Sequence, residues 1–324
     1  MKSNDLRSTT IFLLLSLMAS YSYAESDILD FGPLMVRPQA PLQSNGVNTR
    51  LRDAEYSFER EVFFSISAAS VWAESDDYVL DYYQNDVLGG LQLAVNPAMK
   101  FEISYAFRYA VNNHLDSLTI FFHDMTGINQ NGREEVDNDR FYIDVPDYYD
   151  DPLGDFENEV LGSALEVYLE QLLFKSSINT VSVGGTLYYN YVNSGPFKDA
   201  SFEQAVQLNY TGKFTPHHSL YVMAGLTHRS LNKFSTIALK EWAVNAGIGY
   251  QYRANYRHAY LIEYRIYEGE AENLGDLSDP VNEITLGYRF HFGMSALEFA
   301  MVENVISMDN SADIAFTASF RHRL

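Results

Sequence analysis

The chain of 324 residues has no cysteine and only two tryptophans, and it has few basic side chains. Without cysteine it has no disulfide scaffold, thiolate metal site, cysteine nucleophile or lipid anchor on cysteine. No apolar run reaches the roughly 18 residues that a membrane-spanning helix needs. The 22 Lys and Arg side chains face 43 Asp and Glu, a net charge of −21. This balance argues against a nucleic-acid partner, because phosphate contacts need clustered basic side chains.

The first 24 residues have the pattern of a secretory signal peptide. Lys2 and Arg7 precede the apolar run 11–18, and small residues follow up to Ala24. A basic start, a short apolar core and a small-residue end are typical of a segment that is cleaved after export. We therefore expect a signal peptide over residues 1–24 and, for an exported chain without cysteine, a location in a bacterial envelope.

From residue 59 onward the main signal is alternation of apolar and polar side chains. After Lys100, the apolar side chains from Phe101 to Val111 occupy odd positions, and Glu102 and Arg108 are among the even ones. Successive side chains of a strand point to opposite faces, so such a segment has one apolar and one polar wall. The same pattern predicts twelve strands, centred on 62–72, 87–95, 101–111, 165–169, 181–191, 202–210, 220–226, 242–252, 260–266, 284–292, 297–301 and 314–320.

The connections between these segments alternate in length. Tight connections at 96–99, 174–178, 214–218, 253–257 and 293–295 alternate with longer polar ones at 74–86, 112–159, 192–200, 229–240, 268–280 and 304–311. Short periplasmic turns, longer extracellular loops and an even strand number are typical of outer-membrane barrels. We predict an all-β fold: a transmembrane antiparallel up-and-down β-barrel of twelve strands over residues 58–324.

Two further features agree with insertion into the bacterial outer membrane. Trp72 and Trp242 fall at extracellular strand ends, where an aromatic girdle is expected. The last strand alternates apolar residues up to Leu324, which resembles the C-terminal signal that the barrel-insertion machinery reads. The expected partners are therefore this machinery during assembly and, afterwards, outer-membrane lipid and lipopolysaccharide.

Charged residues on the polar faces are the candidates for the inner wall. They would either pair with one another and fill a narrow barrel or line a polar pathway and tune its selectivity. The lumen-lining candidates are Glu102, Arg108, Glu166, Glu170, Glu263, Arg265, Glu283, Arg289 and Arg321.

Two segments are long enough to close the lumen. Residues 25–57 do not alternate and contain three prolines in Phe31–Pro41, so we expect a periplasmic tail or a lumen plug. In the long connection, apolar side chains at helical spacing predict a short amphipathic helix in or across the barrel mouth. The plug candidates are Leu34, Arg37, Gln39, Leu115, Leu118, Phe122 and Met125.

The long connection between residues 112 and 160 is strongly acidic. It holds thirteen acidic and two basic residues, a charge of −11, which is half of the −22 left after residues 1–24 are removed. Such a loop is either a solvated, repelling surface or a site for divalent ions, which would bridge it to lipopolysaccharide. Its weak metal candidates are Asp147, Asp150, Asp151 and Asp155, although the ordered spacing of a calcium loop is missing.

The stretch from Leu115 to Arg133, LDSLTIFFHDMTGINQNGR, resembles a motif of Gram-negative proteins grouped as a domain of unknown function, DUF 3187. The element from Gly32 to Leu42, GPLMVRPQAPL, is similar to the start expected of the same family. This chain departs in its acid-rich loop, as at Glu134–Glu135. The resemblance implies an outer-membrane barrel, distantly like channels for hydrophobic or aromatic compounds, and implies no catalytic residue.

The sequence favours a non-enzymatic outer-membrane channel or transporter for small molecules, hydrophobic or amphipathic ones included, that works without a cofactor. One alternative is a barrel hydrolase acting on lipids or peptides. Gln43–Gly46 resembles the serine motif of an outer-membrane phospholipase, but Leu42 stands where its histidine would be. His123 with Asp124 is a second candidate pair for hydrolysis. The second alternative is a structural or ion-binding surface barrel.

Overall fold

All twelve predicted segments are strands of one closed antiparallel barrel. The computed structural model describes residues 29–47, 49–55, 59–126, 132–229, 233–234, 237–304, 306 and 308–324; for Phe122, His123, Met125, Thr126, Glu134, Lys233, Phe234 and Met308 it describes the backbone alone. The predicted signal peptide lies outside these residues. Residues 31–324 form one compact unit.

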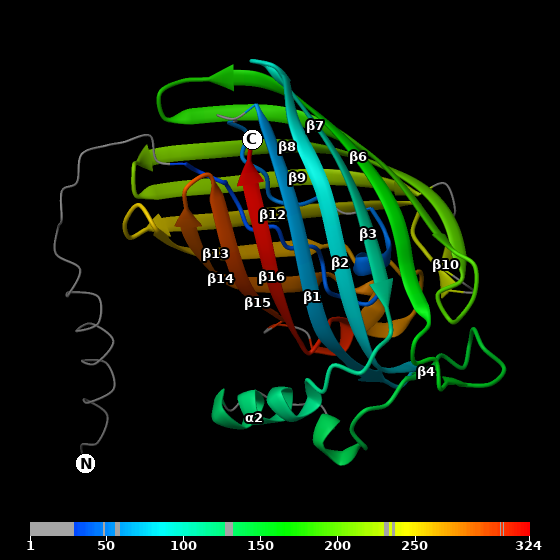
Figure 1. Cartoon of the computed structure of the whole chain (residues 1–324). Helices are drawn as coiled ribbons and strands as arrows, with labels where there is room; N and C mark the ends of the chain where they lie inside the picture. The colour runs from blue at the N-terminus through cyan, green and yellow to red at the C-terminus, as the bar shows by residue number, and fades with distance from the viewer. Residues whose placement is uncertain are drawn as a thin grey trace, which may run out of the picture. The chain divides into compact units, whose positions relative to one another are not determined.

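The barrel strands follow chain order, and the last closes on the first. They are β1 (Arg60–Ser75), β2 (Tyr78–Asn96), β3 (Met99–Tyr109), β6 (Val160–Lys175), β7 (Asn179–Val192), β8 (Asp199–Thr215), β9 (His218–Arg229), β12 (Trp242–Arg253), β13 (His258–Tyr267), β14 (Val281–Phe292), β15 (Ser295–Glu303) and β16 (Ile314–Arg323). β1 pairs with β2 on one side and with β16 on the other, where Glu61 faces Arg323 and Ser70 faces Ile314. Figure 1 shows this closure where β16, in red, lies along β1, in blue. The predicted fold class is confirmed.

Alternation along each strand separates an apolar outer face from a polar inner face. In β3, Ile103, Tyr105 and Phe107 are exposed on the outside, whereas Glu102 and Arg108 are buried inside. An apolar exterior over a polar interior is what a barrel in a lipid bilayer requires.

The two ends of the barrel differ. At one end, here the short-turn end, neighbouring strands are joined by tight turns, and β1 begins and β16 ends there; the opposite end is the long-loop end. The expected long connection at 74–86 is wrong, because β1 and β2 run on to a tight turn between Ser75 and Tyr78. Their ends extend beyond their other neighbours, and β4 (Tyr142–Asp144) pairs with this extension of β2.

The other long connections carry short elements. The connection after β3 holds α2 (Asp116–Thr126), η2 (Arg133–Glu135), β4 and β5 (Leu153–Gly154); those after β9, β13 and β15 hold β10 (Lys233–Phe234) with β11 (Ile237–Ala238), η3 (Gly275–Ser278) and η4 (Met308–Asn310), respectively. Among the described residues, no helix has the length and apolarity needed to cross a membrane. In Figure 1, α2 lies beyond the strand ends on the side where β4 is labelled.

These connections pack into an apolar cap over the long-loop end. Its aromatic centre is Tyr82, Phe141, Phe156 and Phe197, whose rings meet edge-on with centroids 5.5–6.5 Å apart. Leu34, Val36 and Leu42 belong to the same cluster, which therefore joins the cap to the chain inside the barrel. Burial of apolar side chains on both faces explains why alternation fades in this part of β2.

The two tryptophans of the predicted girdle differ in their surroundings. Trp242 is 51% exposed on the outer face, as an interfacial aromatic should be, whereas Trp72 is only 4% exposed. The guanidinium of Arg133 lies 5.4 Å from the ring centre of Trp72 and covers it. The expectation for Trp72 is wrong because the long acidic connection folds over this strand end.

Candidate functional site: the plugged lumen

The chain before β1 folds into the barrel and fills its lumen. The described part of residues 31–55, here called the plug, runs inward as a first arm (31–40), turns at 41–46 through η1 (Gln43–Asn45) and returns as a second arm (47 and 49–55). The two ends of the plug meet, since a Cβ on Gly32 would stand 2.7 Å from that of Asp53. Gly32 has φ +69°, a conformation that glycine adopts without strain. Both this backbone conformation and the lack of space for a side chain therefore favour glycine at this position. The plug thus enters and leaves at the same end.

Wall carboxylates bind the main chain of the first arm through its N–H groups. Extended chain that pairs with no strand must find other acceptors for these groups, and glutamates of β13, β14 and β15 supply them. The bonds are Leu34 N to Glu263 Oε1 (2.7 Å), Met35 N to Glu298 Oε2 (3.0 Å), and Gln39 N and Ala40 N to Glu283 Oε1 (2.6 and 3.1 Å). Hydrogen bonds to an ionised acceptor are stronger than neutral ones.

Wall arginines bind the carbonyl groups of the same arm. The bonds are Arg289 Nη2 to the oxygens of Gly32 and Pro33 (2.7 and 3.1 Å), Arg321 Nη1 to that of Pro33 (2.9 Å) and Arg265 Nη1 to that of Val36 (3.0 Å). These arginines also pair with wall carboxylates, as Arg289 does with Glu298 at 2.7 Å. The wall charges therefore both pair with one another and bind the plug.

The second arm brings its own charges to the opposite wall. Arg50 and Arg52 both bind the carboxylate of Glu102, with Arg52 Nη1 at 2.8 Å from Oε2. Arg52 also lies 3.5 Å from Glu166 and stacks 3.6 Å from the ring centre of Tyr168. Glu102 is 1% exposed, so removal of either arginine would leave a buried charge with less compensation.

At the short-turn end the plug is anchored by surface ion pairs. Asp53 and Glu55 lie 3.2 and 3.1 Å from the Nζ of Lys213, and Glu55 lies 2.7 Å from that of Lys175. Partial burial raises the pKa of Glu55, but hydrogen bonds and charge from the two lysines outweigh it, so its pKa is below the usual value. The anchor is thus electrostatic and accessible to solvent.

The turn of the plug is held near the long-loop end. Arg108 Nη1 donates to Asn45 Oδ1 at 2.8 Å, and Glu203 Oε2 accepts from Val47 N at 2.7 Å. Arg108 is itself paired with Asp86 of β2 at 3.0 Å. A Cβ on Gly46 would meet the guanidinium of Arg229, which shows how closely the turn approaches the wall.

Apolar side chains of the plug contribute to one large cluster and four small ones. Leu34, Val36 and Leu42 belong to the large cluster, which also includes wall residues of β1, β2, β13 and β15. Met35, Ala40, Val47 and Leu51 each sit in a cluster of their own with two or three wall residues. The Leu34 side chain fills the space over Gly287, where any Cβ would overlap it. The plug is therefore attached by many polar contacts together with these apolar ones.

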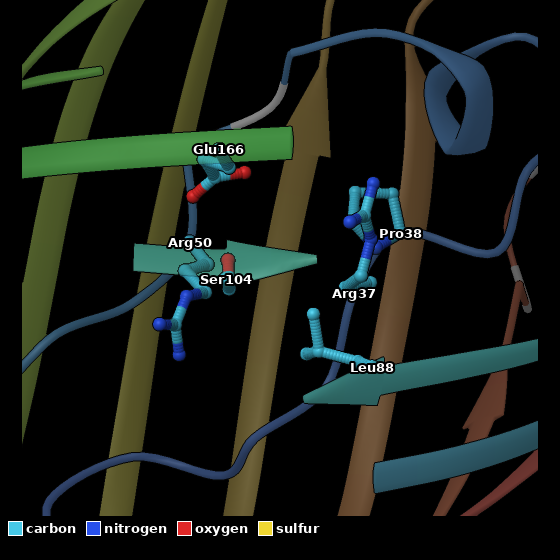
Figure 2. Close-up of a pocket in the computed structure, with 6 residues that line it drawn as sticks. All are labelled: Arg37, Pro38, Arg50, Leu88, Ser104 and Glu166. Carbon is cyan, nitrogen blue, oxygen red and sulfur yellow. The ribbon is translucent and has the colours of Figure 1, made fainter. Parts of the chain in front are cut away.

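A small cavity remains between the two arms and the wall. It is lined by Arg37, Pro38, Arg50, Leu88, Ser104 and Glu166. Figure 2 shows Arg37 and Pro38 on one arm, Arg50 on the other, and Glu166, Ser104 and Leu88 on neighbouring strands. The Nε of Arg37 is buried with no hydrogen-bond partner among the described residues. Arg37 thus borders residual lumen space, while Gln39 is buried and donates to the Arg37 carbonyl.

Sequence reasoning placed the wall candidates, and the structure brings them together around the plug. Glu102, Arg108, Glu166, Glu263, Arg265, Glu283, Arg289 and Arg321 contact it as described; Glu170 instead pairs with Lys100 of the wall at 3.4 Å. Arg50, Arg52 and Glu203 were missed. A usable signal existed for the two arginines, because Arg50-Leu51-Arg52 repeats a positive charge in a segment with few charges.

The helix α2 lies outside the lumen contacts described above. Its polar residues Asp116 and Thr119 are buried, and Asp116 binds Arg133 and accepts from Ser70 Oγ. Leu118 is 43% and Phe121 62% exposed. Leu115 is partly buried, and the side chains of Phe122 and Met125 lie outside the description.

The candidates for other chemistry are dispersed. Asp147, Asp150, Asp151 and Asp155 are exposed, and among the described residues no three His, Asp or Glu side chains gather as a metal site. Ser44 Oγ donates to the carbonyl of Pro41 at 3.1 Å and lies 3.4 Å from Gln84 Oε1. Neither of these two hydrogen-bond partners is a base that could activate the hydroxyl. The side chain of His123 is outside the description.

Comparison with solved structures places the fold among outer-membrane barrels. The chain is similar to the COG4313 outer membrane channel from Pseudomonas putida F1, with a TM-score of 0.55 and 10% identity over 86% of this chain and 100% of that chain. It is less similar to the NanC porin, with a TM-score of 0.46 and 7% identity over 81% of this chain and 100% of that one. At such identity the first likeness shows a shared fold. None of the curated proteins matches the sequence.

The family described as "Protein of unknown function (DUF3187)" matches residues 10–324. This range includes both elements that carried the resemblance in the sequence, the Gly32–Leu42 segment of the plug and the Leu115–Arg133 stretch. The chain therefore belongs to the DUF3187 family.

Proposed function

We propose that this protein is an outer-membrane channel for small molecules, with the barrel lumen as its path and residues 31–55 as its gate. The observation that carries the proposal is the way the lumen is filled. Many hydrogen bonds and ion pairs join the plug to wall side chains; Leu34, Val36 and Leu42 belong to a large apolar cluster, and its other apolar contacts are small and separate.

This attachment favours a gate over a permanent filling. Water replaces a lost polar contact at little net cost, so a typical hydrogen bond contributes only about 0.5–1.5 kcal/mol. A packed apolar core has no such replacement and costs about 25 cal/mol per Å² of surface exposed. A plug held by polar contacts can leave the lumen and bind again while the barrel strands keep their own pairing.

A reversible tether between plug and wall tests the proposal. The γ-carbon of Leu34 lies 3.1 Å from the position of a Cβ on Gly287, so the variant L34C/G287C places one sulfur within bonding reach of the other residue. Because the chain has no other cysteine, the pair cannot form wrong bridges. In planar bilayers we expect openings from the reduced protein under applied voltage and none from the oxidised protein.

Leu34→Cys alone is the matched control, and it should open under both conditions. The proposal fails if the reduced protein never conducts, even when mild urea loosens the plug. It also fails if the oxidised double variant opens as often as the reduced one.

A further inference from the structure

We propose that the opened lumen conducts small cations in preference to anions. This inference rests on the channel function proposed above. It follows from the ion pairs and hydrogen bonds between plug and wall, which break when the plug leaves. The plug inside the barrel is purely basic: residues 31–52 contain Arg37, Arg50 and Arg52 and no acidic residue. Its acids, Asp53 and Glu55, stand at the short-turn end, where they pair with lysines.

The wall opposite these arginines is acidic. Among the described residues, the basic groups within ion-pair distance of Glu102 and Glu166 are Arg50 and Arg52 of the plug. These glutamates lie on the paired strands β3 and β6, where Ser104 faces Glu166 and Glu102 faces Tyr168. Departure of the plug would free both carboxylates at one place in the lumen.

A third carboxylate loses two of its hydrogen-bond donors on the other side of the barrel. Glu283 of β14 accepts two main-chain N–H groups of the plug. The wall arginines lose only contacts to plug carbonyls or amides and keep their carboxylates: Arg289 stays with Glu298, Arg321 with Glu61 at 2.6 Å, and Arg108 with Asp86. Opening therefore uncovers negative charge inside and leaves the positive charge of the wall paired.

Lysines are uncovered only at the rim. Lys175 and Lys213 would lose Glu55 and Asp53, but their side chains are 50% and 24% exposed. Salt screens exposed charges over about 10 Å at 0.1 M ionic strength. Charges inside a narrow, low-dielectric lumen are screened less, so the interior carboxylates should set the selectivity.

The test measures the reversal potential of single openings of the full chain in a KCl gradient. Two variants break the same ion pairs from opposite sides: E102Q/E166Q removes the wall charge, and R50Q/R52Q removes the plug charge. Both should open more often than the wild type. Only E102Q/E166Q should also lose cation preference, by about threefold in the ratio of K⁺ to Cl⁻ permeability.

A matched control removes two acidic charges outside the lumen. D150N/D151N changes exposed residues of the long connection and should alter neither opening nor selectivity. The inference is overturned by wild-type openings that are unselective or anion-selective, or by unchanged selectivity in E102Q/E166Q. If E102Q/E166Q does not fold, R50Q/R52Q decides alone, since its openings must prefer cations. Absence of openings in every variant would instead overturn the channel function itself, and the inference with it.

Discussion

At the residue scale, the wall of this barrel recognises a main chain. Glutamates accept N–H groups and arginines donate to carbonyls, so Glu263, Glu283 and Arg289 would bind an extended segment of many sequences. Specificity for the native plug comes from a few side-chain sites. Gly287 is one of them, because the missing side chain leaves the space that Leu34 fills.

Gly287→Ala should therefore destabilise the plugged state. The added methyl group overlaps Leu34, and overpacking of this kind costs about 1–3 kcal/mol. We expect openings to become about tenfold more frequent, since 1.4 kcal/mol corresponds to a tenfold change. Single-channel recording measures the change.

Two further variants identify the cause. Gly287→Ala with Leu34→Ala should restore wild-type closure in part, because the overlap is removed. Gly185→Ala is the control, since a Cβ there meets only one atom, at an ordinary 3.8 Å, on an exposed face. Equal opening in Gly287→Ala and Gly185→Ala would contradict the role given to Gly287.

At the scale of elements, the two arms of the plug are anchored by different chemistry. The first arm is bound through its main chain deep inside the barrel. The second arm ends in the exposed ion pairs of Glu55 with Lys175 and Lys213. The second anchor should therefore respond to pH in a way that the first does not.

Acid should loosen the second arm. The pKa of Glu55 is lowered in the folded state by the two lysines, against the effect of burial. A lowered pKa stabilises the plugged state above the unfolded value of about 4.3 for Glu, and this contribution is lost as the pH falls through the folded pKa. We expect more openings, and faster proteolysis near residue 55, as the pH falls from 7 toward 3.

Glu55→Gln provides the comparison. It should show the loosened anchor already at pH 7 and lose the part of the pH response that belongs to Glu55. A pH response of Glu55→Gln equal to that of the wild type would assign the effect to other carboxylates.

The elements themselves were largely predictable from sequence. Alternation located all twelve barrel strands because each strand lies between lipid and a polar lumen, which gives it a pattern of period two. The pattern failed in residues 78–86 of β2, where Tyr78, Leu80, Tyr82 and Tyr83 are all buried under the cap. A strand covered on both faces has no alternation to read.

The site was only partly predictable. The alternation of apolar and polar positions predicted that Glu102 and Glu283 face the inner wall, but it could not show what they bind. A carboxylate that accepts main-chain N–H groups leaves no trace in the sequence of the bound segment, since every residue except proline has such a group. The pairing of Glu102 with Arg50 and Arg52 depends on how the plug folds back, which neither segment encodes locally.

At the scale of the whole molecule, two segments could close the barrel, and the contacts assign this task to one of them. The plug contacts many wall residues, whereas α2 leaves Leu118 and Phe121 exposed. The acidic connection after β3 is held by Arg133, which is fully buried and binds Asp116 beside Trp72. It belongs to the cap at the long-loop end.

L118S/F121S should accordingly leave closure unchanged. Both side chains are exposed, so their replacement should alter stability by no more than about 0.5 kcal/mol. Conductance and thermal unfolding in detergent micelles should match the wild type. More frequent openings in this variant would show that α2 also closes the lumen.

The meeting of Gly32 with Asp53 at the short-turn end has a kinetic consequence. Because both ends of the plug lie on the same side, the segment can withdraw as a loop, and no chain end has to be threaded through the barrel. The withdrawn loop stays tethered to β1, so its return is intramolecular, at an effective concentration in the millimolar range for a short flexible tether. Closure should therefore be fast, independent of protein concentration and hard to block with a soluble copy of residues 31–55.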